Sequence, residues 1–91
     1  MSGEAVVLQE GELLLRMAKG DEAAFTLLYR HYSGPLYLNF VRMVKDEVIA
    51  EEIVQDLFSR IWQKRESISI EKNFSAYLYR AGYNLLMDFL P

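Results

Sequence analysis

Apolar side chains recur every three to four positions along most of this 91-residue chain. Four stretches show this spacing most clearly: Phe25, Leu28, Tyr29 and Tyr32; Leu36, Phe40 and Val44; Ile49, Ile53, Leu57 and Ile61; and Leu78, Ala81, Leu85 and Phe89. A period near 3.6 is typical of helices that bury one face, whereas strands alternate with a period of about two. The sequence Ser-Ile-Ser-Ile over residues 67–70 alternates, but so short a run does not support a sheet. The pattern therefore predicts an all-α fold.

Glycine, proline and capping residues divide this pattern into separate helices. Gly20 before Asp21 predicts a helix stop followed by an N-cap, and Asp46 predicts a further N-cap. The Ser-Gly-Pro sequence over residues 33–35 predicts the end of one helix and the start of another, with proline at a first helical position. Residues 66–73 form the longest candidate loop. We expect a compact bundle of about four to five helices, near residues 11–19, 21–32, 35–45, 46–65 and 74–90, behind a flexible tail over residues 1–10.

The expected helix over residues 46–65 has an unusual polar face. On a helical wheel at about 100° per residue, acids, amides and one hydroxyl gather on one arc: Glu52, Gln55, Asp56, Ser59 and Gln63. The cations Arg60 and Lys64 lie to one side of this arc, whereas a helix that is merely solvated more often interleaves Glu with Lys four residues apart. Most charged runs are solvated faces, and the alternative is a surface for a basic protein partner. The helix alone leaves both interpretations open.

The expected helix over residues 74–90 has a second polar stripe, opposite a core side that includes Gly82. The stripe consists of Tyr77, Arg80, Asn84 and Asp88. An aromatic ring, a cation and an amide can stack on a base, contact a phosphate and hydrogen-bond a base edge, although an ordinary solvated face has a similar composition. Gly82 costs a helix about 1 kcal/mol relative to alanine, and its place on the core side predicts close packing against a neighbouring helix.

Composition narrows the classes of function. The chain has no cysteine, which excludes disulfides and thiolate metal sites. Its single histidine, His31, lacks the Glu-x-x-His spacing of carboxylate di-metal bundles, so we expect a packing residue and no metal or cofactor. No apolar run approaches the roughly 20 residues that span a bilayer, and the N-terminus does not resemble a signal peptide. We therefore expect a soluble, cytoplasmic protein without a membrane partner.

Charge is unevenly distributed along the chain. The net charge of −3 argues against a nucleic-acid partner. However, residues 1–56 hold five basic and ten acidic side chains, whereas residues 57–91 hold five basic and three acidic ones. The two halves can therefore face partners of different charge. An enzyme built on paired carboxylates would need a nucleophile, a base and an orienting group at workable spacing, and the sequence offers none, so we do not expect an enzyme.

Three blocks occur in a specific order along the chain: GDEAAFTLLYRHY, then EEIVQDLFSRIW, then FSAYLYRAGYNLLMDFL. Together they resemble region 2 of an extracytoplasmic-function (ECF) sigma factor, the helical domain of a bacterial transcription initiation factor of the sigma-70 family. The resemblance covers about residues 11–90 and implies a sigma region 2 domain over residues 11–91. It also implies three partners: core RNA polymerase, the non-template strand of promoter DNA and an anti-sigma factor.

The resemblance assigns functions to both polar faces. In the family, the helix with the Gln-acid pair docks on the clamp helices of the largest catalytic polymerase subunit. By position, polymerase binding would fall to Glu52, Gln55, Asp56, Phe58 and Ser59. The last helix matches the one that contacts the −10 promoter element, and the loop before it matches the base-capture pocket. The DNA-binding candidates are Ser69, Lys72, Asn73, Tyr77, Arg80, Asn84 and Asp88. Alternatively, Ser69 and Asn73 only cap and turn the chain.

The sequence also departs from the family pattern. Glu52 and Asp56 exchange the usual Asp and Glu and keep the charge, and Tyr77 replaces the usual Trp and can still stack. Tyr83 stands where Arg is common, and the final Phe-Leu-Pro lacks the usual basic residue, so phosphate affinity is expected to be lower. The C-terminal promoter-reading domain of a complete factor is absent from this chain, which suggests an excised domain. The alternative function is a sigma-like mimic domain that binds an anti-sigma factor without binding DNA.

Overall fold

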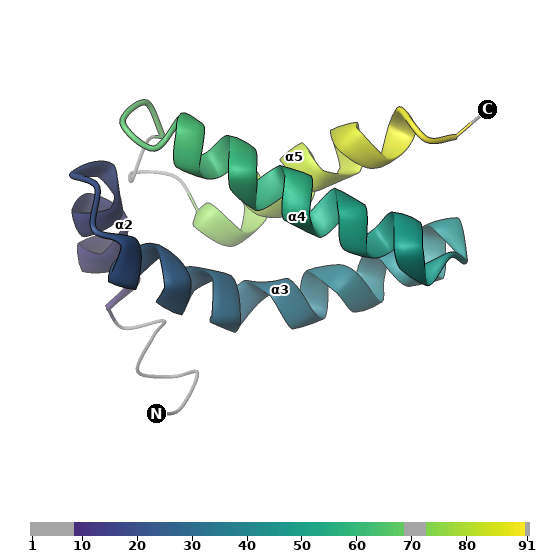
Figure 1. Cartoon of the computed structure of the whole chain (residues 1–91), viewed down its shortest axis with the longest axis horizontal. Helices are drawn as coiled ribbons and strands as arrows, with labels where there is room; N and C mark the ends of the chain where they lie inside the picture. The colour runs from purple at the N-terminus through teal and green to yellow at the C-terminus, as the bar shows by residue number, and fades with distance from the viewer. Residues whose placement is uncertain (1–8, 69–72, 91) are drawn as a thin grey trace.

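A computed structural model describes residues 9–68 and 73–90 of the chain. Its regular elements are four helices: α2 (Glu10–Ala18), α3 (Glu22–Val44), α4 (Glu47–Gln63) and α5 (Phe74–Met87). Figure 1 shows α3 and α4 running side by side in opposite directions, with α5 beside α4 and with α2 at the N-terminal end of α3. The all-α prediction is confirmed. Most of the expected tail over residues 1–10 lies outside the described residues, and α2 already begins at Glu10.

The predicted N-caps of α3 and α4 are confirmed. The Asp21 carboxylate accepts hydrogen bonds from the backbone N–H groups of Ala23 and Ala24, at 3.0 and 3.2 Å. Asp46 caps α4 in the same way. These oxygens satisfy backbone donors that have no partner inside the helix, which fixes where each helix starts. Gly20 precedes Asp21 with a φ of 93°, in the left-handed region that a glycine adopts without strain.

The predicted break at residues 33–35 is wrong, because α3 continues through Pro35 as one helix of 23 residues. Proline removes one hydrogen bond from the helix ladder. Leu28 before it and Leu36 and Phe40 after it are nonetheless buried in one core. Both halves of α3 therefore pack on the same neighbours, and this tertiary packing outweighs the local cost of proline. Pro35 itself is exposed, so its ring disturbs no core contact.

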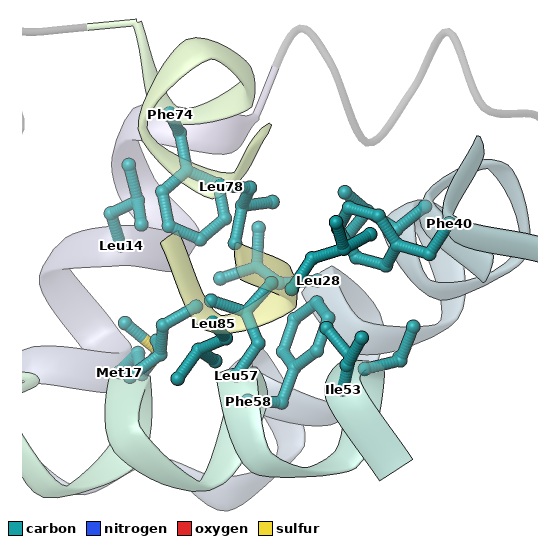
Figure 2. Packing of buried hydrophobic residues seen from close by; sticks show 14 of the residues in the cluster. Leu14, Met17, Leu28, Phe40, Ile53, Leu57, Phe58, Phe74, Leu78 and Leu85 are labelled. Carbon is teal, nitrogen blue, oxygen red and sulfur yellow. The ribbon is translucent and has the colours of Figure 1, made fainter. Parts of the chain in front are cut away.

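The core lies between the four helices and is entirely apolar (Figure 2). Gly82 of α5 faces the Phe40 ring of α3, and a Cβ at Gly82 would overlap that ring, which confirms the predicted close packing. One core assignment is wrong: Phe89 is 47% exposed, because α5 ends at Met87. Leu86 is buried instead, since the core-facing side of α5 is wider than the apolar spacing indicated.

Candidate functional site

The acid-and-amide arc of α4 lies on the solvent side of the bundle. We use this name for Glu52, Gln55, Asp56 and Ser59, which are all exposed. The opposite side of α4 is anchored in the core by Ile53, Val54, Leu57 and Ile61. Phe58, expected near the edge of the arc, is only 3% exposed and belongs to the core. The arc is therefore a polar surface on a helix that packing holds in a fixed orientation.

A groove between α3 and α4 borders the arc on one side. It has a volume of about 360 Å³, and its aromatic lining consists of Phe25, Tyr29, Phe58 and Trp62. Gln55 of the arc donates a hydrogen bond from its amide Nε2 to the Tyr29 hydroxyl, at 2.9 Å. The Phe58 ring packs against the Tyr29 ring in an edge-to-face arrangement, with ring centroids 4.9 Å apart. Phe58 thus acts on this surface through Tyr29, by packing.

A second groove, between α4 and α5, borders the arc on the other side and has a volume of about 350 Å³. From α5 it is lined by Tyr77, Asn84 and Asp88, three members of the predicted stripe. From α4 it is lined by Arg60 and Lys64, which the sequence did not indicate as DNA-binding residues. The groove thus combines an aromatic ring, an amide, a carboxylate and two cations. The fourth member of the stripe, Arg80, is exposed on α5 outside this groove.

One ion pair connects the arc to the α4–α5 groove. Arg60 Nε lies 3.2 Å from Asp56 Oδ1, four residues earlier on α4. The two side chains are 55% and 48% exposed. Asp56 is a member of the arc and Arg60 lines the groove, so the pair joins the surface predicted for polymerase to the surface predicted for DNA.

The predicted base-capture loop is described only at its ends. Ser69 and Lys72 lie outside the described residues. Asn73 caps α5, because its side-chain oxygen accepts a hydrogen bond from the Ala76 backbone N–H at 3.2 Å. Tyr77 follows one turn later, half-buried, with its ring stacked on that of Phe74 at a centroid distance of 6.4 Å. The stack holds the Tyr77 ring in place beside the groove.

Other polar groups of the described residues serve the packing of the bundle. His31 is half-buried, and its ring contacts that of Tyr32 in an edge-to-face arrangement. Tyr32 donates a hydrogen bond to the Glu10 carboxylate, which ties α3 to α2. Burial raises the pKa of Tyr32, and the hydrogen bond to Glu10 raises it further. Within residues 9–68 and 73–90, no group of three potential ligands could hold a metal ion. None of the helices described is long and apolar enough to cross a membrane.

Comparison with known proteins identifies the family to which this helical fold belongs. The family model "Sigma-70 region 2" matches residues 28–90, so the chain belongs to the Sigma-70 region 2 family. Its relatives place it among region 2 domains of ECF sigma factors, which confirms the predicted resemblance. The chain is 34% identical over 73 residues to the ECF RNA polymerase sigma factor SigW of Bacillus subtilis, covering 80% of this chain and 39% of SigW.

Two further comparisons agree with this family. The chain is 28% identical over 82 residues to the RNA polymerase sigma-H factor of Pseudomonas aeruginosa, covering 90% of this chain and 42% of that protein. It thus spans about two fifths of the length of these relatives. A solved structure, an engineered region 2 of sigmaE in complex with GTAAAA, superposes with a TM-score of 0.79 at 29% identity. That superposition covers 87% of this chain and 82% of the other.

Proposed function

We propose that this domain docks on core RNA polymerase through the acid-and-amide arc and captures the non-template strand of the −10 promoter element through α5 and the loop before it. The observation that carries the proposal is the α4–α5 groove, where an aromatic ring, an amide and two cations converge in a member of the Sigma-70 region 2 family. A related region 2 forms a complex with GTAAAA. Both faces lie on the packed helices α4 and α5, so docking would also position the groove.

Docking is expected to be electrostatic and to need little rearrangement. Glu52 and Asp56 present carboxylates to solvent, and Gln55 lies at the edge of the same arc that faces α3. Such a surface complements a basic partner, for which the clamp helices of the largest polymerase subunit are the candidate. Because the buried side of α4 fixes the helix in the core, the arc is already in its binding orientation.

Capture of the promoter strand would use stacking and base-edge contacts. Tyr77 offers a ring for stacking, and Asn84 and Asp88 offer hydrogen-bonding groups to base edges. An unstacked base that binds here shifts the DNA equilibrium toward the open form, because only the open form presents it. The domain performs no bond chemistry in this mechanism. It acts by binding the melted state.

The docking step is tested by reversing the charge of the arc. We expect the double variant Glu52→Lys, Asp56→Lys to bind core polymerase more than about 100-fold more weakly than the wild type, because like charges across an interface cost several kcal/mol. Its helicity and Tm should stay nearly unchanged, since both positions are exposed. The matched control is Glu12→Lys, Glu66→Lys, which changes two exposed acids elsewhere. Unaltered polymerase affinity in the arc variant would refute the docking assignment.

A further inference from the structure

Arg60 occupies the boundary between the two proposed surfaces. Arg60 lines the α4–α5 groove, and its Nε donates a hydrogen bond to the Asp56 carboxylate of the arc, at 3.2 Å. Lys64 lies one helical turn further along the same edge of the groove. Among the residues that the structure describes, these two supply the positive charge of the groove, and Asp88 on α5 opposes them. The charge available to an anion in the groove therefore depends strongly on what Arg60 is paired with.

An anion in the groove and the Asp56 carboxylate would compete for the same guanidinium. Arginine binds phosphate and carboxylate with the same planar fork of N–H donors, so both fit the same geometry. While Asp56 holds Arg60, the carboxylate also repels a phosphate nearby. A basic partner that neutralises Asp56 would remove both effects at once.

We propose that Arg60 is a phosphate-binding residue of the α4–α5 groove and that Asp56 is its competitor within the domain. A basic partner docked on Asp56 releases Arg60 to a phosphate of single-stranded nucleic acid, with Lys64 as the second cation. This inference rests on the proposed function, because it takes the partner of the arc to be polymerase and the ligand of the groove to be a nucleic-acid strand. It adds the way in which docking strengthens strand binding.

We expect the Arg60–Asp56 pair to break at a small cost in free energy and the resulting gain in strand affinity to be modest. Ion pairs between exposed residues four apart on a helix contribute little to stability, so Arg60 can leave Asp56 at small cost. Coupling between two binding sites commonly changes affinity by about 5- to 150-fold. Because this ion pair is weak and exposed, we expect its coupling to lie at the lower end of that range. We expect roughly a fivefold gain in strand affinity when Asp56 is neutralised. By linkage, a bound strand strengthens docking by the same factor.

The test measures binding of the 91-residue domain, without polymerase, to a fluorescein-labelled single-stranded DNA of sequence GTAAAA. Binding is followed by fluorescence anisotropy at about 50 mM salt, because phosphate contacts contribute most at low salt. Asp56→Asn imitates docking by removing the carboxylate charge. Glu52→Gln is the matched control, because it removes one charge from the same arc four residues earlier. Arg60→Gln, alone and combined with Asp56→Asn, completes a double-mutant cycle.

Asp56→Asn should bind the strand about fivefold more tightly than the wild type, and Glu52→Gln should gain less than half as much. In the Arg60→Gln background the gain from Asp56→Asn should fall to that of the control. The NMR signal of the Arg60 side-chain Nε–H should also shift on strand binding in Asp56→Asn. Equal gains from Asp56→Asn and Glu52→Gln, or a full gain without Arg60, would overturn the exchange, as would a lack of measurable binding by Asp56→Asn.

Failure of this inference can be told apart from failure of the proposed function. If Tyr77→Ala weakens strand binding by the polymerase-bound domain while Asp56→Asn gains no more than Glu52→Gln, strand capture stands and the exchange is refuted. If Tyr77→Ala has no effect and Asp56→Asn does not bind the strand, both proposals are refuted. Circular dichroism and Tm should show that the variants at Glu52, Asp56 and Arg60 fold, because these residues are exposed, and the same measurements check the fold of Tyr77→Ala, since Tyr77 is half-buried.

Discussion

At the scale of single residues, the contact between Gly82 of α5 and Phe40 of α3 constrains the core. Phe40 is fully buried, and the space for its ring exists only because position 82 has no side chain. Alanine is the better helix former by about 1 kcal/mol. The sequence therefore accepts a helix-weakening residue to bring α5 close to α3.

Gly82→Ala should consequently destabilise the domain. The added methyl group overlaps the Phe40 ring, and overpacking of this kind commonly costs about 1–3 kcal/mol. This cost should exceed the gain in helix propensity, so the free energy of unfolding measured by urea denaturation should fall. A variant as stable as the wild type, or more stable, would show that the two helices do not pack this closely.

Asp21 links the stability of the domain to pH. The hydrogen bond from Arg16, at 2.8 Å, and then that from the Ala24 backbone N–H lower the pKa of Asp21 in the folded state. Because the folded pKa lies below the unfolded value of about 3.9, this contribution is complete above that pH and is lost as the pH falls through the folded pKa. Acid should therefore weaken the start of α3.

Asp21→Asn tests this dependence, because asparagine keeps a capping oxygen but does not titrate. The variant should have a lower Tm than the wild type at pH 7, where it lacks the ion pair with Arg16. The difference in Tm should shrink as the pH is lowered below about 4. Thermal melts followed by circular dichroism give both values, and a Tm difference that stays constant down to pH 2.5 (about 1.4 units below the free aspartate value) would contradict the assignment.

At the scale of elements, α3 shows where local signals stop being sufficient. Ser33, Gly34 and Pro35 are each common at helix ends, yet the helix passes through them because Leu28 and Leu36 on either side share one core. No described atom lies within 4 Å of a Cβ placed on Gly34, so this position is helical and open.

Gly34→Ala should therefore stabilise the domain, in contrast to Gly82→Ala. Replacing an exposed glycine inside a helix gains about 0.5–1 kcal/mol, chiefly because the unfolded chain loses freedom. The same urea denaturation measures it, and the opposite signs of the two glycine variants make each a control for the other. A loss of stability in Gly34→Ala would indicate that the helix breaks here, as the sequence pattern alone predicted.

The sequence predicted those features of the site that depend on residues close together in the chain. The caps at Asp21 and Asp46 depend on a few neighbouring residues, and both were predicted. The apolar period also placed the arc correctly on the solvent side of α4. It could not show that Arg60 and Lys64 would line a groove with α5, because a helical wheel gives the direction of a side chain on its own helix and not the neighbour that it faces. For the same reason it could not show that Phe58, on the apolar side of α4, would contact Tyr29 of α3.

At the scale of the whole molecule, α4 is a ridge between two grooves. The aromatic groove with α3 lies on one side and the mixed polar groove with α5 on the other. The acids of the arc occupy the ridge, and Arg60 and Lys64 occupy the edge toward α5. A chain with a net charge of −3 thus concentrates positive charge where the proposed function places the DNA strand. Its acids remain available to a basic protein partner.

Strand capture by the polymerase-bound domain is the central claim, and Tyr77 tests it most directly. The measurement is a fluorescence titration of the domain, bound to core polymerase, with a labelled single strand of the −10 promoter element. Tyr79→Ala is the matched control, because it removes another half-buried tyrosine of α5 that does not line the groove.

Base stacking is worth about 1–3 kcal/mol, so Tyr77→Ala should weaken strand binding about 5- to 150-fold while Tyr79→Ala leaves it unchanged. Core polymerase without the domain should bind the strand more weakly than either complex. Equal affinity for the wild type and Tyr77→Ala would contradict capture at this groove. A wild-type complex that binds no better than polymerase alone would instead favour a sigma-like mimic domain that does not bind DNA.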